Sequence, residues 1–171
     1  MKIDYPSLSL QDALDIAILI EEEAEERYTD LADQLEQHRT PEAAKFFRVM
    51  VFAESKHAEK LRERRQAAFG DAPSKVDSTI VPEIEAPAFD SVRAFITEHA
   101  ALRVALASET RAEEFYAKAL EQVTDKDVRE LFSEMRAEEV EHQGLVQERL
   151  DKLPPEDTRD PDDYVDPPVA Q

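Results

Sequence analysis

The fold and function of this chain depend on Met135-Arg-Ala-Glu-Glu-Val-Glu-His142, which contains the motif Glu139-x-x-His142. The same motif occurs earlier, as Glu54-x-x-His57. On an α-helix, residues three apart lie on one face, so a carboxylate and an imidazole at this spacing can bind one metal ion together. Each pair interrupts an apolar stripe, so both pairs are expected to point into a core.

Four segments place apolar residues at helical spacing, and acidic residues or acidic residues with histidine interrupt each stripe near its middle. The interrupting residues are Glu21 in the first segment, Glu54 and His57 in the second, Glu109 in the third, and Glu139 and His142 in the fourth. Helix starts are expected at Ser9, Thr40-Pro41, Asp90 and Thr124, and a helix end is expected at Gly70.

The two halves of the chain repeat one pattern. Glu109 and Tyr116 stand 88 positions after Glu21 and Tyr28, and Glu139 and His142 stand 85 positions after Glu54 and His57. The repeat predicts an all-α four-helix bundle over residues 1–153, built from two repeated helix pairs. Residues 71–89 contain three prolines and predict a long crossover connection between the pairs. Residues 154–171 are proline-rich and acidic, and we interpret them as a separate tail.

Composition excludes several classes of function. The chain has 171 residues and a net charge of −19, which argues against nucleic acid and anionic membranes as partners. It has no cysteine, which excludes disulfides and iron–sulfur clusters. We see no signal-peptide core and no apolar run near the ~20 residues that span a bilayer. A cytoplasmic protein is therefore expected.

Four carboxylates facing one another in a core require compensation. Each unpaired buried charge costs several kcal/mol, whereas a whole domain is stable by about 5–15 kcal/mol. Two divalent cations would balance four negative charges, and the two imidazoles would complete the ligand sets. Such a carboxylate-rich set suits iron or manganese, whereas zinc tends toward fewer ligands. Tyr28 and Tyr116 lie two turns beyond Glu21 and Glu109, where their hydroxyls could hydrogen-bond to ligand carboxylates.

These residues resemble the rubrerythrin and erythrin branch of the ferritin-like superfamily, whose bundles supply two glutamates and two Glu-x-x-His motifs. The matching motifs are Glu21-x-x-Ala24-x-x-x-Tyr28, Glu109-x-x-Ala112-x-x-x-Tyr116, Glu54-Ser-Lys-His57-Ala58 and Glu139-Val-Glu-His142. The resemblance implies a ferritin-like fold and two iron ions, with manganese or zinc as substitutes, that react with hydrogen peroxide or dioxygen. It implies that the ligands are Glu21, Glu54, His57, Glu109, Glu139 and His142.

The chain also departs from that family. Without a cysteine-rich electron-transfer module, electrons must come from an external donor or from ferrous iron. Ala112 stands where rubrerythrins carry an extra glutamate, so the expected site resembles a ferroxidase centre more closely. Ser55 stands where a haem-binding methionine would lie, so no haem is expected. Glu25 and Glu113 could add a carboxylate or gate metal, although such acids are more often solvated.

Several functions remain open at this point. The leading hypothesis is an oxidoreductase that reduces peroxide or dioxygen. The alternatives are a ferroxidase that feeds an iron store, a bundle with a purely structural metal, and a hydrocarbon oxygenase. We further expect a homodimer or larger homo-oligomer.

Overall fold

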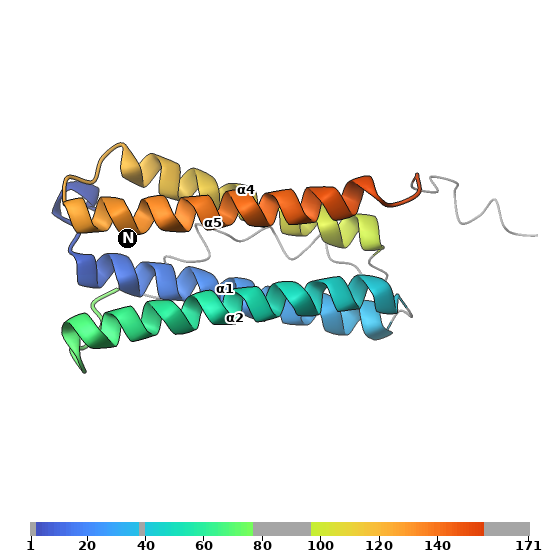
Figure 1. The fold of residues 1–171 in the computed structure, drawn as a ribbon, viewed down its shortest axis with the longest axis horizontal. Helices are drawn as coiled ribbons and strands as arrows, with labels where there is room; N and C mark the ends of the chain where they lie inside the picture. Colours follow the sequence, from blue (N-terminus) through green and yellow to red (C-terminus); the bar gives the residue numbers. More distant parts are fainter. Residues whose placement is uncertain (1–2, 38–39, 77–96, 156–171) are drawn as a thin grey trace, which may run out of the picture.

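The computed structural model describes residues 3–37, 40–76 and 97–155, and these residues form four long α-helices and no strand (Figure 1). The helices are α1 (Leu10–Gln37), α2 (Pro41–Phe69), α4 (Glu98–Leu120) and α5 (Lys126–Asp151), preceded by the short 3-10 helix η1 (Tyr5–Ser7). The predicted all-α, ferritin-like four-helix bundle is confirmed. Among the described helices, none combines the length and apolar character that a membrane span requires.

The four helices form two antiparallel hairpins that pack against each other. In Figure 1, α1 lies against α2 and α4 lies against α5, while α2 and α4 run in the same direction. The end of α2 and the beginning of α4 are therefore at opposite ends of the bundle. The helix start predicted at Asp90, most of the predicted crossover connection and most of the predicted tail lie outside the described residues.

The first hairpin begins and ends its helices close to the predicted residues. The backbone N–H of Asp12 donates to the Ser9 hydroxyl at 3.2 Å, which caps α1. Helix α2 begins at Pro41 as predicted, but the Thr40 hydroxyl does not cap it and instead donates to the Leu35 carbonyl at 2.8 Å. Helix α2 ends before Gly70, whose φ of 55° is a conformation that glycine adopts at little cost.

The cap of α5 differs from the prediction by one residue. Asp125, and not Thr124, is the N-cap, because its carboxylate accepts from the backbone N–H groups of Asp127 and Val128. Thr124 instead donates to the Pro6 carbonyl at 3.4 Å, which ties the α4–α5 turn to the amino-terminal segment. A carboxylate at this position also interacts favourably with the helix dipole, which explains the preference for Asp125.

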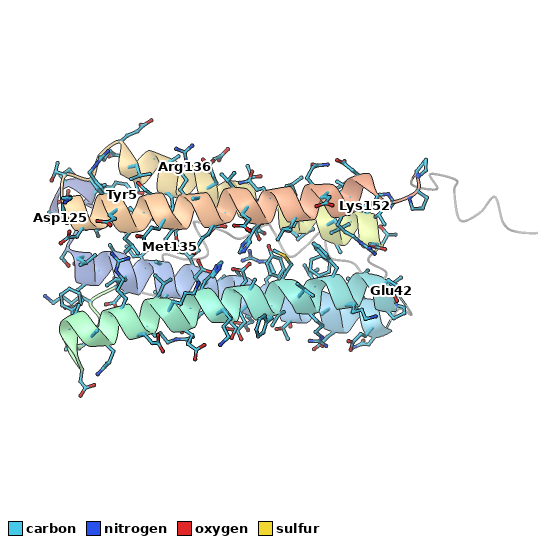
Figure 2. The ribbon with its side chains drawn as sticks, in the orientation of Figure 1. Tyr5, Glu42, Asp125, Met135, Arg136 and Lys152 are labelled. Atoms are coloured by element: carbon cyan, nitrogen blue, oxygen red, sulfur yellow. The ribbon has the colours of Figure 1, made fainter. Side chains whose placement is uncertain are left out.

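Two apolar clusters fill the bundle, one on each side of a polar layer at its middle. The first cluster includes Ile16, Ile20, Leu61, Tyr116 and Phe132, and the second includes Tyr28, Phe47, Met50, Leu102 and Val146. Both clusters take side chains from all four helices. Figure 2 shows Met135 pointing from α5 into the interior, at the edge of this layer. The bundle therefore has two apolar cores separated by polar residues.

An ion pair fixes one end of the first hairpin. The guanidinium of Arg65 donates to the Asp15 carboxylate at 2.6 Å and to the Gly70 carbonyl at 2.9 Å. Both charged side chains are largely buried, so the pair joins α1, α2 and the turn after α2. At the other end of the bundle, Arg149 of α5 pairs with Glu98 at the start of α4.

Replacing Phe132 with alanine should lower the free energy of unfolding by about 3–5 kcal/mol, because a fully buried ring is lost and a cavity remains. The matched control is Phe52→Ala on α2, since the Phe52 ring is 65% exposed. We expect the control to change the free energy of unfolding by no more than about 0.5 kcal/mol. Urea denaturation followed by circular dichroism measures both values, and equal losses would contradict this description of the core.

Candidate metal centre

The polar layer brings together all six side chains that the sequence analysis selected. Glu21 comes from α1, Glu54 and His57 from α2, Glu109 from α4, and Glu139 and His142 from α5. The four glutamates and His142 are at most 5% exposed, whereas the His57 side chain is 15% exposed. Each ligand candidate occupies the position on its helix where an apolar stripe would otherwise continue. The stripe geometry therefore carries these polar groups into the interior.

His142 lies among buried carboxylates. Its Nδ1 atom is 3.1 Å from Oε1 of Glu54 and 3.4 Å from Oε2 of Glu109. Burial alone would lower the pKa of His142, but the carboxylates of Glu109 and Glu54 outweigh it and raise the pKa to about 10. At neutral pH this imidazole therefore carries a proton when no cation competes for its nitrogen. Glu109, Glu139 and His142 offer ligand atoms that all lie within 4.8 Å of one another.

His57 occupies the second half of the layer. Its Nδ1 atom is 3.6 Å from Oε2 of Glu21 and 3.9 Å from Oε2 of Glu54. A third carboxylate, Glu138 of α5, places Oε2 at 3.7 Å from the same nitrogen. None of these oxygens forms a hydrogen bond with Nδ1, which is buried and has no hydrogen-bond partner among the residues that the structure describes. Carboxylates surround this nitrogen without satisfying it.

Glu54 stands between the two halves. Its Oε1 atom faces His142 and its Oε2 atom faces His57. The two imidazole rings are stacked, with centroids 5.2 Å apart and an angle of 4° between their planes. Each ring thus presents Nδ1 to its own carboxylates, and Glu54 offers one oxygen to each side.

The arrangement fits a pair of bound cations. Ligand atoms that share one ion, each about 2 Å from it, lie roughly 3–4 Å apart. The contacts around Nδ1 of His57, at 3.6–3.9 Å, fall in this range, although they are too long for hydrogen bonds. The unsatisfied nitrogen and the excess of buried carboxylates both favour a positive ion at this place.

The two tyrosines are fully buried, and their rings pack against aromatic neighbours. The ring of Tyr28 lies 5.8 Å from that of Phe47, and the ring of Tyr116 lies 5.4 Å from that of Phe132. Within the described ranges the hydroxyl of Tyr28 has no hydrogen-bond partner, so the bond predicted from it to a ligand carboxylate is not formed. Both side chains adjoin the layer as parts of the two apolar cores.

One further carboxylate lies close to the six ligand candidates. It belongs neither to Glu25 nor to Glu113, the two acids that the sequence analysis considered. Glu113 accepts a hydrogen bond from Arg136 at 2.6 Å, and Glu25 is a half-buried residue of α1 outside the clusters of ligand atoms. Glu138 approaches His57 instead. It precedes Glu139 directly, so it lies on the flank of the α5 stripe and not on the stripe itself. Comparison of the two repeated motifs does not point to Glu138, because its counterpart 85 positions earlier is Ala53.

Comparisons with known proteins agree with this architecture. The structure of an uncharacterized conserved protein from Magnetospirillum magnetotacticum MS-1 superposes with a TM-score of 0.76 at 28% sequence identity. The similarity covers 89% of this chain and 100% of that protein. No significant match exists among curated proteins.

The family model described as Rubrerythrin matches residues 12–150, and matches again over residues 100–169. The first match spans all four helices and includes every glutamate and histidine of the polar layer. Its extent, the four-helix bundle and the six converging side chains lead to one assignment. The chain belongs to the rubrerythrin family.

Proposed function

We propose that the chain is a non-haem di-iron oxidoreductase of the rubrerythrin type, which reduces hydrogen peroxide or dioxygen. The observation that carries this proposal is the buried layer in which two histidines and four glutamates converge from four helices. Membership of the rubrerythrin family supports it. When bound, two iron ions supply the electrons for this reduction and alternate between ferrous and ferric states.

The residues divide into two sets around the histidines. Glu21 and His57 would hold one ion, and Glu109, Glu139 and His142 would hold the other. Glu54 would serve both ions, since one of its oxygens faces each histidine. Four carboxylates balance the charge of two divalent cations, so the loaded layer is neutral.

The surroundings of the site also support a redox role. The apolar cores on either side keep water and larger molecules away from the buried oxygens. Access is left on the side where α2 and α5 face each other, because His57 is the more exposed of the two histidines. A small oxidant such as peroxide or dioxygen suits so narrow an approach.

The source of electrons distinguishes the proposal from its main alternative. The chain contains no cysteine and therefore carries no iron–sulfur or rubredoxin-like centre of its own. If ferrous iron is itself the electron source, the protein acts as a ferroxidase that feeds an iron store. If an external donor restores the ferrous state, it acts as a peroxidase or oxidase.

Stopped-flow absorbance after anaerobic loading with two ferrous ions tests the proposal. We expect hydrogen peroxide to oxidise the loaded protein faster than dioxygen does, when each is added in a separate run. The reverse order would favour the ferroxidase, and inertness toward both oxidants would leave the metal a structural role.

The variant Glu54→Gln tests the same proposal by removing the carboxylate that faces both histidines. The control is Glu141→Gln, which removes one negative charge from the exposed face of α5. Loss of the Glu54 carboxylate should reduce the oxidation rate by about 10- to 100-fold, the range that changes to residues orienting metal ligands commonly produce. The control should keep the wild-type rate.

Metal loading should also release a proton from His142. The raised pKa means that its imidazole is protonated at pH 7–8, and a cation can bind Nδ1 only after that proton leaves. Binding should therefore tighten as the pH rises, and this gain should end as the pH passes through about 10. In weakly buffered solution with an indicator dye, His142→Gln should release about one proton fewer per protein than wild type. His99→Gln, a half-buried histidine of α4, should release as many protons as wild type.

A further inference from the structure

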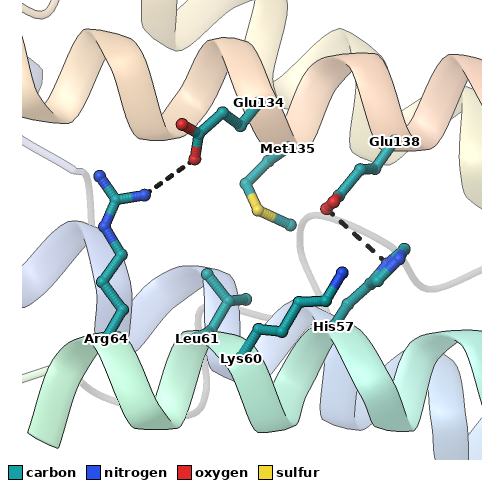
Figure 3. Close-up of a pocket in the computed structure, with 7 residues that line it drawn as sticks. All are labelled: His57, Lys60, Leu61, Arg64, Glu134, Met135 and Glu138. Carbon is teal, nitrogen blue, oxygen red and sulfur yellow. Dashed lines mark hydrogen bonds and ion pairs between the residues drawn. The ribbon is translucent and has the colours of Figure 1, made fainter.

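A pocket opens beside the candidate metal centre, on the face where α2 and α5 lie side by side. It measures about 100 Å³, and the described residues that line it all belong to these two helices (Figure 3). Leu61 and Met135 form an apolar part of the lining. At one end Arg64 pairs with Glu134 at 2.8 Å, and at the other end Glu138 faces His57.

Glu138 connects this pocket with the buried layer. Its side chain is 34% exposed, yet its Oε2 atom lies 3.7 Å from Nδ1 of His57. Glu21, His57 and Glu138 offer ligand atoms that lie within 4.8 Å of one another. Among the described residues, three clusters of ligand atoms surround the two histidines. Glu138 is the member of these clusters whose side chain is substantially exposed and also lies close to a buried ligand candidate.

The two halves of the centre differ in whether an exposed carboxylate lies next to the histidine. Glu109, Glu139 and His142 are all buried, so within the described part of the chain the His142 half has no comparable exposed carboxylate. The position in α2 that corresponds to Glu138 in the internal repeat is Ala53. The difference between the two halves therefore corresponds to one position of the repeat, which is glutamate in α5 and alanine in α2.

Charge balance argues against a permanent role for Glu138 as a ligand. The four buried glutamates already neutralise two divalent cations, and a fifth carboxylate bound to them would leave a surplus negative charge. A solvated carboxylate can instead hold a partly hydrated cation and pass it to the imidazole, exchanging water for protein ligands one at a time.

We propose that Glu138 is the residue through which divalent cations enter and leave the His57 half of the centre. The inference rests on the proposed function only in requiring that the layer binds two ions. A transit residue lowers the barrier in both directions, so its loss slows uptake and release together and leaves the equilibrium affinity nearly unchanged. Loss of a permanent ligand has the opposite signature, because release becomes faster and an ion is lost.

Stopped-flow absorbance with Co²⁺ as the probe measures uptake, and transfer of the bound Co²⁺ to a chelator measures release. Glu138→Gln should slow uptake by about tenfold, which is the lower end of the gain in association rate that a charged cleft provides. Release should slow in the same proportion, because the equilibrium affinity stays nearly unchanged. Two Co²⁺ ions should still bind per protein. Glu141→Gln removes the same charge from the same helix away from the pocket, and screening should keep its rates within about twofold of wild type.

Two results would overturn the role of Glu138: uptake and release at wild-type rates in Glu138→Gln, or faster release together with the loss of one ion. A wild-type protein that fails to bind two Co²⁺ ions would instead contradict the proposed function. The two failures are therefore distinguishable in one set of measurements.

Discussion

The structure depends on how the negative charges of four buried carboxylates are balanced. Each would cost several kcal/mol if it were ionised and unpaired, which is a large fraction of the stability of a domain. His142 supplies part of the compensation, because Glu54 and Glu109 hold a proton on its imidazole up to a pH of about 10. One imidazolium cannot balance four carboxylates. The proposed pair of cations would complete the balance and would also account for the lack of a hydrogen-bond partner for Nδ1 of His57 among the described residues.

The fold serves this layer by holding it rigidly between two apolar cores. Aromatic residues pack tightly on each side, with Tyr116 against Phe132 in one core and Tyr28 against Phe47 in the other. Because close-packed interiors resist deformation, the six polar side chains keep their positions even though the four carboxylates repel one another. Glu54 occupies the centre of this arrangement and couples the two histidines through its two oxygens.

Periodicity predicted most of the fold and of the candidate centre. A residue that interrupts an apolar stripe has to point inward, so Glu21, Glu109 and the two Glu-x-x-His motifs could be found without coordinates. Glu138 could not, since it lies beside the stripe and its approach to His57 depends on how α5 is placed relative to α2. Thr124 and Asp125 are both residue types that cap helices, and the structure shows that Asp125 caps α5 while Thr124 donates to Pro6, a residue distant in the sequence.

Both apolar cores take side chains from both hairpins, and the ligand candidates divide in the same way, with three from each hairpin. A hairpin excised from this chain would therefore expose one side of its core and possess only half of the candidate two-cation centre. It could bury that surface and complete the site by associating with a second hairpin of the same pattern. The chain is, in this respect, a covalently joined dimer of two similar hairpins, and linking them removes the concentration dependence that such an association would have.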